Sequence, residues 1–241
     1  MPDISFIILS TQRSGSTLLV NILDGMDNAM VAGEVFKEVD VREILHPEWT
    51  FDYPSKASKL LFPLMKAHWI RRHLLQFRSG VGTRGFKLMI SQIDIMPEIV
   101  PLAQRFGYKF IILRRPDFLA QALSLELARA HNKWVNMGQA EIGSVNLSIQ
   151  SVLKSLRFFR RSDEMLEGFA RLPQSLTLYY DELVNAQEQG IKKVCKFLEI
   201  PFMGIPTTDL KPTSERSYSE RIKNIEQLRL ALDREGYIFA G

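Results

Sequence analysis

The chain has 241 residues, of which 46% are hydrophobic and 24% are charged, as in an ordinary globular domain with room for a sizeable core. Its net charge of +4 and its lack of a long basic run argue against a nucleic-acid-binding protein, although they suit an anionic ligand. The only cysteine, Cys195, excludes an intramolecular disulfide and a cysteine-rich metal site, and it favours a reducing compartment.

The start of the chain has no basic segment before its short apolar run, and the sequence contains no stretch of about 18 apolar residues. We therefore expect a leaderless cytoplasmic protein without a membrane span. The sequence shows neither a linker nor an internal repeat, which predicts a single domain over residues 1–241.

Four short apolar segments have the composition of strands that are buried on both faces of a parallel sheet. Residues 31–33 form a fifth short strand or a loop. Helical patterns separate the strands, among them residues 117–131, opened by Asp117, and residues 149–169. The expected fold is α/β, with a P-loop-like central parallel sheet flanked by helices on both faces. The four segments are residues 4–9, 84–90, 108–113 and 175–180.

The first strand runs into the loop Arg-Ser-Gly-Ser-Thr at residues 13–17, and a helix begins at once. The free N–H groups and the dipole of a helix's first turn attract an anion, and Gly15 allows the backbone to come close to it. The loop differs from the triphosphate loop G-x-x-x-x-G-K-[ST], because Ser10 and Ser16 replace a glycine and the lysine. Arg13 supplies the cation instead. The pattern predicts a site for a phosphate-like anion, and the alternative is a turn that holds no ligand.

Residues 12–17, Gln-Arg-Ser-Gly-Ser-Thr, resemble the loop of sulfotransferases that use 3'-phosphoadenosine 5'-phosphosulfate (PAPS). In that family the first strand ends in Pro/Gln-(Lys/Arg)-Ser-Gly-(Ser/Thr)-Thr. The segment Tyr-Asp-Glu-Leu-Val at 180–184 is similar to a family strand end, and we interpret it as structural. Lys211 and residues 214–224 resemble the loop that closes over the nucleotide in the bacterial, trehalose-sulfotransferase-like branch. The resemblance implies PAPS as the co-substrate.

A second polar group follows the strand at 108–113, where Arg114 and Arg115 precede a helix that carries Ser124. Ligands collect at the carboxyl ends of the strands in such sheets, and the planar fork of arginine suits phosphate oxygens. The resemblance implies that an arginine here and the serine hold the 3'-phosphate of the nucleotide. Family members place the arginine eight or nine residues before the serine, and both arginines remain candidates. The alternative is ordinary surface pairing.

Sulfuryl transfer needs a base for the acceptor hydroxyl and cations where the leaving phosphate gains charge. Glu34, in an Ala-Gly-Glu segment after the first helix, resembles the base of the trehalose-type enzymes, and the alternative is an exposed loop carboxylate. Lys87 lies in an apolar strand, where a lysine is costly unless it is paired, and we expect a second cation or a lysine that snorkels from an edge strand. The substitute bases are Glu38, His46, His68 and His73.

The sequence thus predicts a sulfotransferase that moves the sulfuryl group of PAPS to a hydroxyl of a sugar, glycolipid or other small molecule by in-line displacement. No motif for a metal ligand set occurs, and we expect no metal. The alternatives are a kinase-like phosphoryl transferase, against which the missing loop lysine argues, and a silent nucleotide-binding protein. The predicted catalytic residues are Glu34, Arg13 and Lys87. The predicted nucleotide-binding residues are Gln12, Arg13, Ser14, Gly15, Ser16, Thr17, Arg114, Arg115, Ser124 and Lys211.

Overall fold

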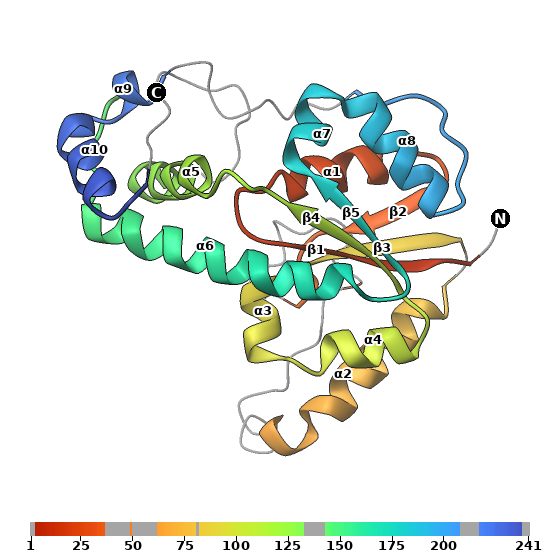
Figure 1. Ribbon diagram of the computed structural model, residues 1–241. Helices are drawn as coiled ribbons and strands as arrows, with labels where there is room; N and C mark the ends of the chain where they lie inside the picture. The colour runs from red at the N-terminus through yellow and green to blue at the C-terminus, as the bar shows by residue number, and fades with distance from the viewer. Residues whose placement is uncertain are drawn as a thin grey trace.

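Figure 1 shows the computed structural model of the chain, which describes residues 3–36, 49, 62–80, 82–132, 143–207 and 217–237. A five-stranded sheet lies at its centre, with the order β2-β3-β1-β4-β5 and parallel pairing between neighbours. The expected α/β fold is confirmed. Val31 and Ala32, which were expected in a short strand or a loop, lie in β2. The strands are β1 (Ser5–Ser10), β2 (Ala29–Ala32), β3 (Thr83–Met89), β4 (Lys109–Arg114) and β5 (Ser175–Tyr179).

The central strand, β1, is buried along its whole length because it pairs with β3 on one side and with β4 on the other. Its side chains alternate between two apolar clusters. Ile7 and Leu9 belong to the cluster on one face of the sheet, and Phe6 and Ile8 belong to the cluster on the opposite face. Burial on both faces explains why this strand is a continuous apolar run.

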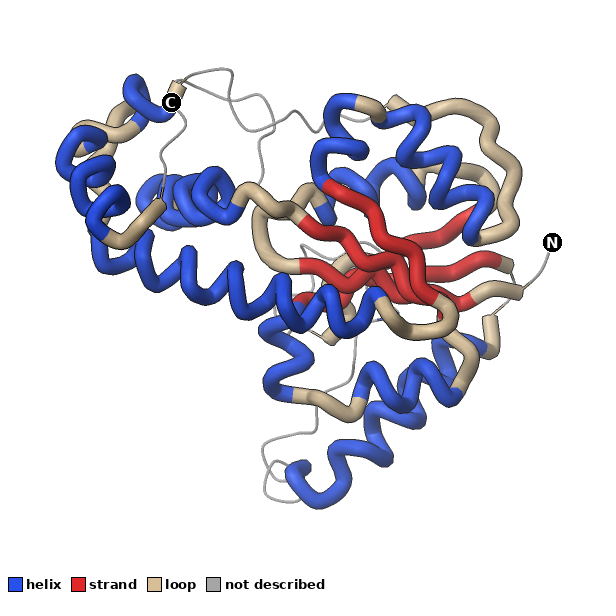
Figure 2. Tube along the Cα trace, viewed as in Figure 1, coloured by secondary structure: helices blue, strands red, loops and turns tan. Residues whose placement is uncertain are grey.

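Helices cover both faces of the sheet, as Figure 2 shows. Within the described ranges they are α1 (Ser16–Asp24), α2 (Phe62–Arg78), α3 (Ile90–Ile95), α4 (Ile99–Arg105), α5 (Phe118–His131), α6 (Ile149–Ala170), α7 (Tyr180–Asn185), α8 (Gln187–Phe197), α9 (Tyr218–Arg221) and α10 (Ile225–Arg234). Apolar residues of α1, α7 and α8 pack on one face, and those of α2, α3, α4 and the end of α6 pack on the other. None of these helices is long and apolar enough to cross a membrane.

A third apolar cluster packs α5, α6 and α10 against one another, and these helices extend to one side of the sheet. The segment before α10 is attached here, because Val145 and Ile222 form a parallel bridge and the Tyr218 hydroxyl donates to the carbonyl of Ala120 at 3.3 Å. Asp117 caps α5, as expected, by accepting from the N–H of Ala120 at 2.9 Å. The C-terminal segment therefore lies against the helix that follows β4, at the carboxyl edge of the sheet.

His73 on α2 packs edge-on against Phe36, with 5.0 Å between the ring centroids, and burial lowers the pKa of His73 to about 4. An unfolded histidine titrates near 6.5, so the unfolded chain binds a proton first as the pH falls. Stability should then decrease from about pH 6.5 to 4, by up to about 1.4 kcal/mol per pH unit. Urea unfolding at several pH values should show a shallower loss in His73→Phe than in the wild type, and parallel losses would contradict this.

Candidate active site

The loop between β1 and α1 is folded around two residues with positive φ. Arg13 has φ 59° and Gly15 has φ 82°, and Gly15 is the N-cap of α1. A Cβ on Gly15 would also lie 3.0 Å from a ring carbon of Tyr180, so glycine is needed for its conformation and for this close approach. The buried Ser14 donates to the carbonyl of Thr11 at 2.8 Å and tightens the loop. The N–H groups of the first turn of α1 therefore face the loop, as an anion site requires.

Gln121 on α5 holds the start of this loop. Its side-chain Nε2 donates to Thr11 Oγ1 at 2.7 Å and to the carbonyl oxygen of Gln12 at 2.6 Å, and the residue is only 1% exposed. Gln12 in turn donates to Ser91 Oγ at 3.4 Å. Sequence reasoning missed Gln121, although a glutamine within an otherwise apolar helix was the available signal.

Arginines from two segments meet at the start of the loop. Arg13 Nε donates to Ser124 Oγ at 2.9 Å, and Arg115 donates from its terminal guanidinium nitrogen to the carbonyl oxygen of Arg13 at 2.8 Å. The Arg115 guanidinium stacks on the ring of Tyr180, 4.2 Å from its centroid. Burial first, and then the nearby charge of Arg115, lower the pKa of Arg13. The structure thus brings the predicted residues Arg13, Arg115 and Ser124 together at the start of the loop.

A third arginine, Arg221, was not itself named as a site residue, but it lies in residues 214–224, the segment that resembles the loop closing over the nucleotide. Its charge also lowers the pKa of Arg13, and burial lowers the pKa of Arg221 itself. In the described part of the chain, Nε of Arg115 is buried without a hydrogen-bond partner. Cations gathered in this way favour an anionic ligand. The predicted residue Lys211 and residues 214–216 lie outside the described residues.

The neighbouring Arg114 is directed toward α6 instead. It makes two hydrogen bonds to the Asp163 carboxylate, at 2.8 and 2.6 Å, and lies 3.6 Å from Glu167 Oε2. The bond to Asp163 is the main cause that raises the pKa of Arg114. Both residues of the Arg114–Asp163 pair are largely buried, so this guanidinium is occupied within the protein.

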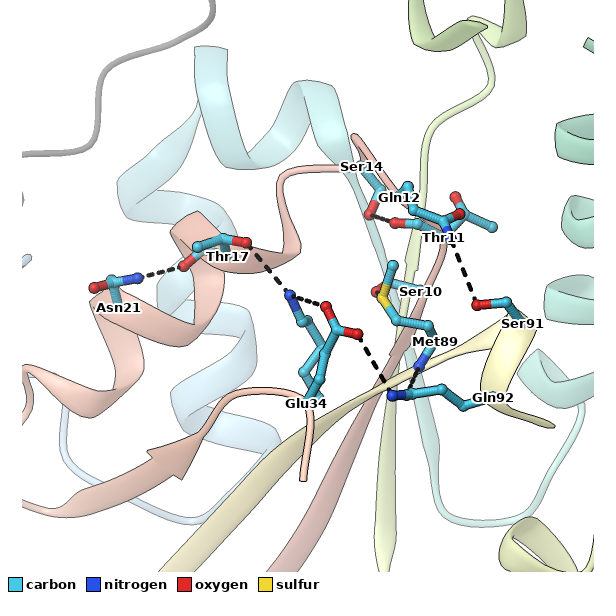
Figure 3. A network of polar contacts seen from close by, with 11 residues as sticks. Ser10, Thr11, Gln12, Ser14, Thr17, Asn21, Glu34, Met89, Ser91 and Gln92 are labelled. Atoms are coloured by element: carbon cyan, nitrogen blue, oxygen red, sulfur yellow. Dashed lines mark hydrogen bonds and ion pairs between the residues drawn. The ribbon is translucent and has the colours of Figure 1, made fainter. Parts of the chain in front are cut away.

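Glu34 lies at the other end of the loop, near Thr17 (Figure 3), and its carboxylate meets Lys87 of β3. Lys87 Nζ is 3.1 Å from Glu34 Oε1 and donates to Thr17 Oγ1 at 3.4 Å. Gln92 Nε2 donates to Glu34 Oε2 at 3.4 Å. Lys87 is 8% exposed and β3 lies between β2 and β1, so the edge-strand alternative for this lysine is wrong. Glu34 is paired and only 23% exposed in its side chain, which differs from a free loop carboxylate.

The substitute bases fall in other places. His68 is on the exposed side of α2, and His73 packs against Phe36 as described above. Glu38 and His46 lie outside the described residues. Within the described ranges, no group of three or more His, Cys, Asp or Glu side chains could hold a metal ion.

A parallel sheet, a glycine loop at the amino end of a helix and arginines at the next strand end define an α/β protein with a phosphate-binding loop. A sequence model of the Stf0 sulphotransferase family matches residues 5–223. The chain therefore belongs to the Stf0 sulfotransferase family and is a sulfotransferase, which confirms the resemblance seen in the sequence.

Solved structures share this fold at low sequence identity. The sulfotransferase domain from the curacin biosynthetic pathway has a TM-score of 0.55 and 16% identity, over 100% of this chain and 93% of that chain. A sulfotransferase from Alicyclobacillus acidocaldarius has a TM-score of 0.52 and 13% identity, over 97% of this chain and 94% of that chain. A comparison with curated proteins found no match.

Proposed function

We propose that this sulfotransferase transfers the sulfuryl group of PAPS to an acceptor hydroxyl. The observation that carries the proposal is that one loop has a polar cluster at each end. Arg13, at its start, meets Arg115 and Ser124, whereas Thr17, at its end, meets Lys87 and through it Glu34. PAPS has a phosphate on its 3'-oxygen and a phosphosulfate on its 5'-oxygen, so it suits two separate sites for anions.

The first cluster is proposed to hold the 3'-phosphate. Arg115 is favoured over Arg114, because Asp163 already takes the Arg114 guanidinium whereas the buried Nε of Arg115 lacks a partner in the described part. The sequence predicts Arg13 both as a catalytic cation and as a nucleotide-binding residue. Its Nε instead bonds Ser124, so we now assign it with Arg115 to the 3'-phosphate, and Arg221 adds positive charge there.

The second cluster is proposed to carry the chemistry. Glu34 takes the proton of the acceptor hydroxyl. At the same time the acceptor oxygen forms a bond to sulfur, and the bond from sulfur to the 5'-phosphate oxygen breaks. Adenosine 3',5'-bisphosphate (PAP) leaves with the electrons of that bond. Lys87 and the amino end of α1 are proposed to stabilise this added charge, and the contact of Lys87 with Thr17 in the first turn of α1 supports this.

The acceptor is proposed to be a sugar, glycolipid or other small hydroxylated molecule. The reaction is proposed to take place in the cytoplasm, and residues 1–241 are proposed to form one domain. The test is incubation with ³⁵S-labelled PAPS and a panel of such acceptors, with Glu34→Gln as the matched control. A labelled product that forms with the wild type and fails to form with the variant supports the proposal. Transfer of phosphate from ATP in the same panel would instead support the kinase-like alternative.

A further inference from the structure

Three helices in the described part begin with the same capping arrangement, in which the third helical residue accepts the backbone N–H of the N-cap residue. Glu182 accepts from Tyr179 at 2.7 Å in α7, and Glu220 accepts from Ser217 at 2.8 Å in α9. In α3 the acceptor is Gln92, whose Oε1 takes the N–H of Met89 at 2.8 Å. In these described helices, a carboxylate performs this task twice and an amide once.

The amide of Gln92 has a second contact that a carboxylate could not make. Because the N–H of Met89 fixes Oε1, the orientation of the amide is determined, and Nε2 is left to donate to Glu34 Oε2 at 3.4 Å. Lys87 Nζ holds the other oxygen, Oε1, at 3.1 Å. Figure 3 shows Gln92 joined to both Met89 and Glu34. Gln92 is 7% exposed, so water competes little for these contacts.

We propose that Gln92 is a positioning residue for Glu34: through its amide, which is fixed by Met89, it holds the plane of the carboxylate for proton transfer. The importance of this for catalysis rests on the proposed function, in which Glu34 is the base. A donor bonded to a carboxylate favours the charged form, and a second carboxylate nearby disfavours it. Within the described part, the charged group that faces Glu34 is Lys87 from β3, whose ammonium is shared with Thr17 from α1.

The test uses Gln92→Glu, which preserves the acceptor for the N–H of Met89 but replaces the donor to Glu34 with a like charge. The matched control is Glu182→Gln, the reverse exchange at the equivalent position of α7. Glutamate carboxyl carbons are labelled with ¹³C, and the Glu34 signal is assigned by its loss in Glu34→Gln. We expect the midpoint of Glu34 protonation to move to higher pH by about one unit or more in Gln92→Glu. The control should leave it unchanged.

Equal midpoints in the wild type and in folded Gln92→Glu would overturn the proposal. If this variant does not fold, Gln92→Met decides in its place, because it removes the donor without adding charge: a smaller rise in the midpoint supports the proposal and no rise overturns it. Turnover of labelled PAPS is measured in parallel as a function of pH. The pH at which turnover falls on the acid side should shift with the midpoint of Glu34 protonation. A midpoint that moves while turnover does not respond still supports the control of Glu34 by Gln92, and it rejects Glu34 as the base.

Discussion

Replacing Glu34 with glutamine should lower kcat by a factor of about 10² to 10⁴, which is the usual contribution of a general base. Glutamine has nearly the same shape, and its single carbonyl oxygen can still accept from Lys87 or from Gln92, which contact the two carboxylate oxygens of Glu34 at 3.1 and 3.4 Å. It cannot take a proton from the acceptor. The Kd for PAP should change little, because the residues proposed to hold the 3'-phosphate lie at the other end of the loop.

The measurement is steady-state transfer from ³⁵S-labelled PAPS to the acceptor found in the panel, together with calorimetric titration of PAP. A kcat within a few-fold of the wild-type value would reject Glu34 as the base. A large loss of PAP affinity would show that this side chain supports the nucleotide site instead. Circular dichroism of the variant controls for misfolding.

Arg115→Leu should weaken PAP binding by about 1.5–3 kcal/mol, or roughly 10- to 150-fold in Kd, the usual effect of losing hydrogen bonds to a charged group. Binding of 5'-AMP, which lacks the 3'-phosphate, should change much less. Since the Arg115 guanidinium also stacks on Tyr180 and bonds the carbonyl of Arg13, thermal unfolding must show that the variant keeps its fold.

The adjacent arginine provides the matched control. Arg114→Leu should leave PAP affinity unchanged and instead reduce the free energy of unfolding by about 1–3 kcal/mol, because the largely buried Asp163 loses its partner. Titration of PAP and urea unfolding of both variants test this separation. Equal losses of PAP affinity in the two variants, or a larger loss in Arg114→Leu, would contradict the assignment of the 3'-phosphate to Arg115.

The strands and the loop could be predicted from the sequence because their signals are local. A strand buried on both faces is a short apolar run, as in β1, and a glycine at the start of a helix marks the loop. Asp117 predicted the start of α5 for the same reason, since its side chain bonds an N–H only three residues away. Such features depend on residues that are close neighbours in the chain, so the sequence alone is enough to predict them.

The choice between Arg114 and Arg115 could not be predicted, because it depends on a partner far away in the chain. Arg114 is taken by Asp163, 49 residues later, and this pairing follows from how α6 packs beside β4. Successive residues at a strand end also point in different directions, so a shift of one residue exchanges their roles. The spacing to Ser124, nine residues from Arg115 and ten from Arg114, agrees better with Arg115 but left both arginines as candidates.

The polar residues that sequence reasoning missed depend on equally distant contacts. Gln92 meets Glu34 across 58 positions and Gln121 meets Thr11 across 110, so the sequence does not show which groups these glutamines bond. Arg221 lies near Arg13 only because Ile222 pairs with Val145 and Tyr218 contacts α5. Only the packing of the helices reveals that these side chains belong to one region.

The most direct measurement of the central claim compares the stability of the wild-type protein with PAP, with 5'-AMP, and with ADP plus Mg²⁺. A ligand at about 100 times its Kd should add about 2.7 kcal/mol to the free energy of unfolding. We predict that PAP, at equal concentration, stabilises the protein much more than either of the others, because only PAP carries the 3'-phosphate. Greater stabilisation by ADP and Mg²⁺ than by PAP, or no response to PAP at all, would contradict a PAPS-dependent enzyme.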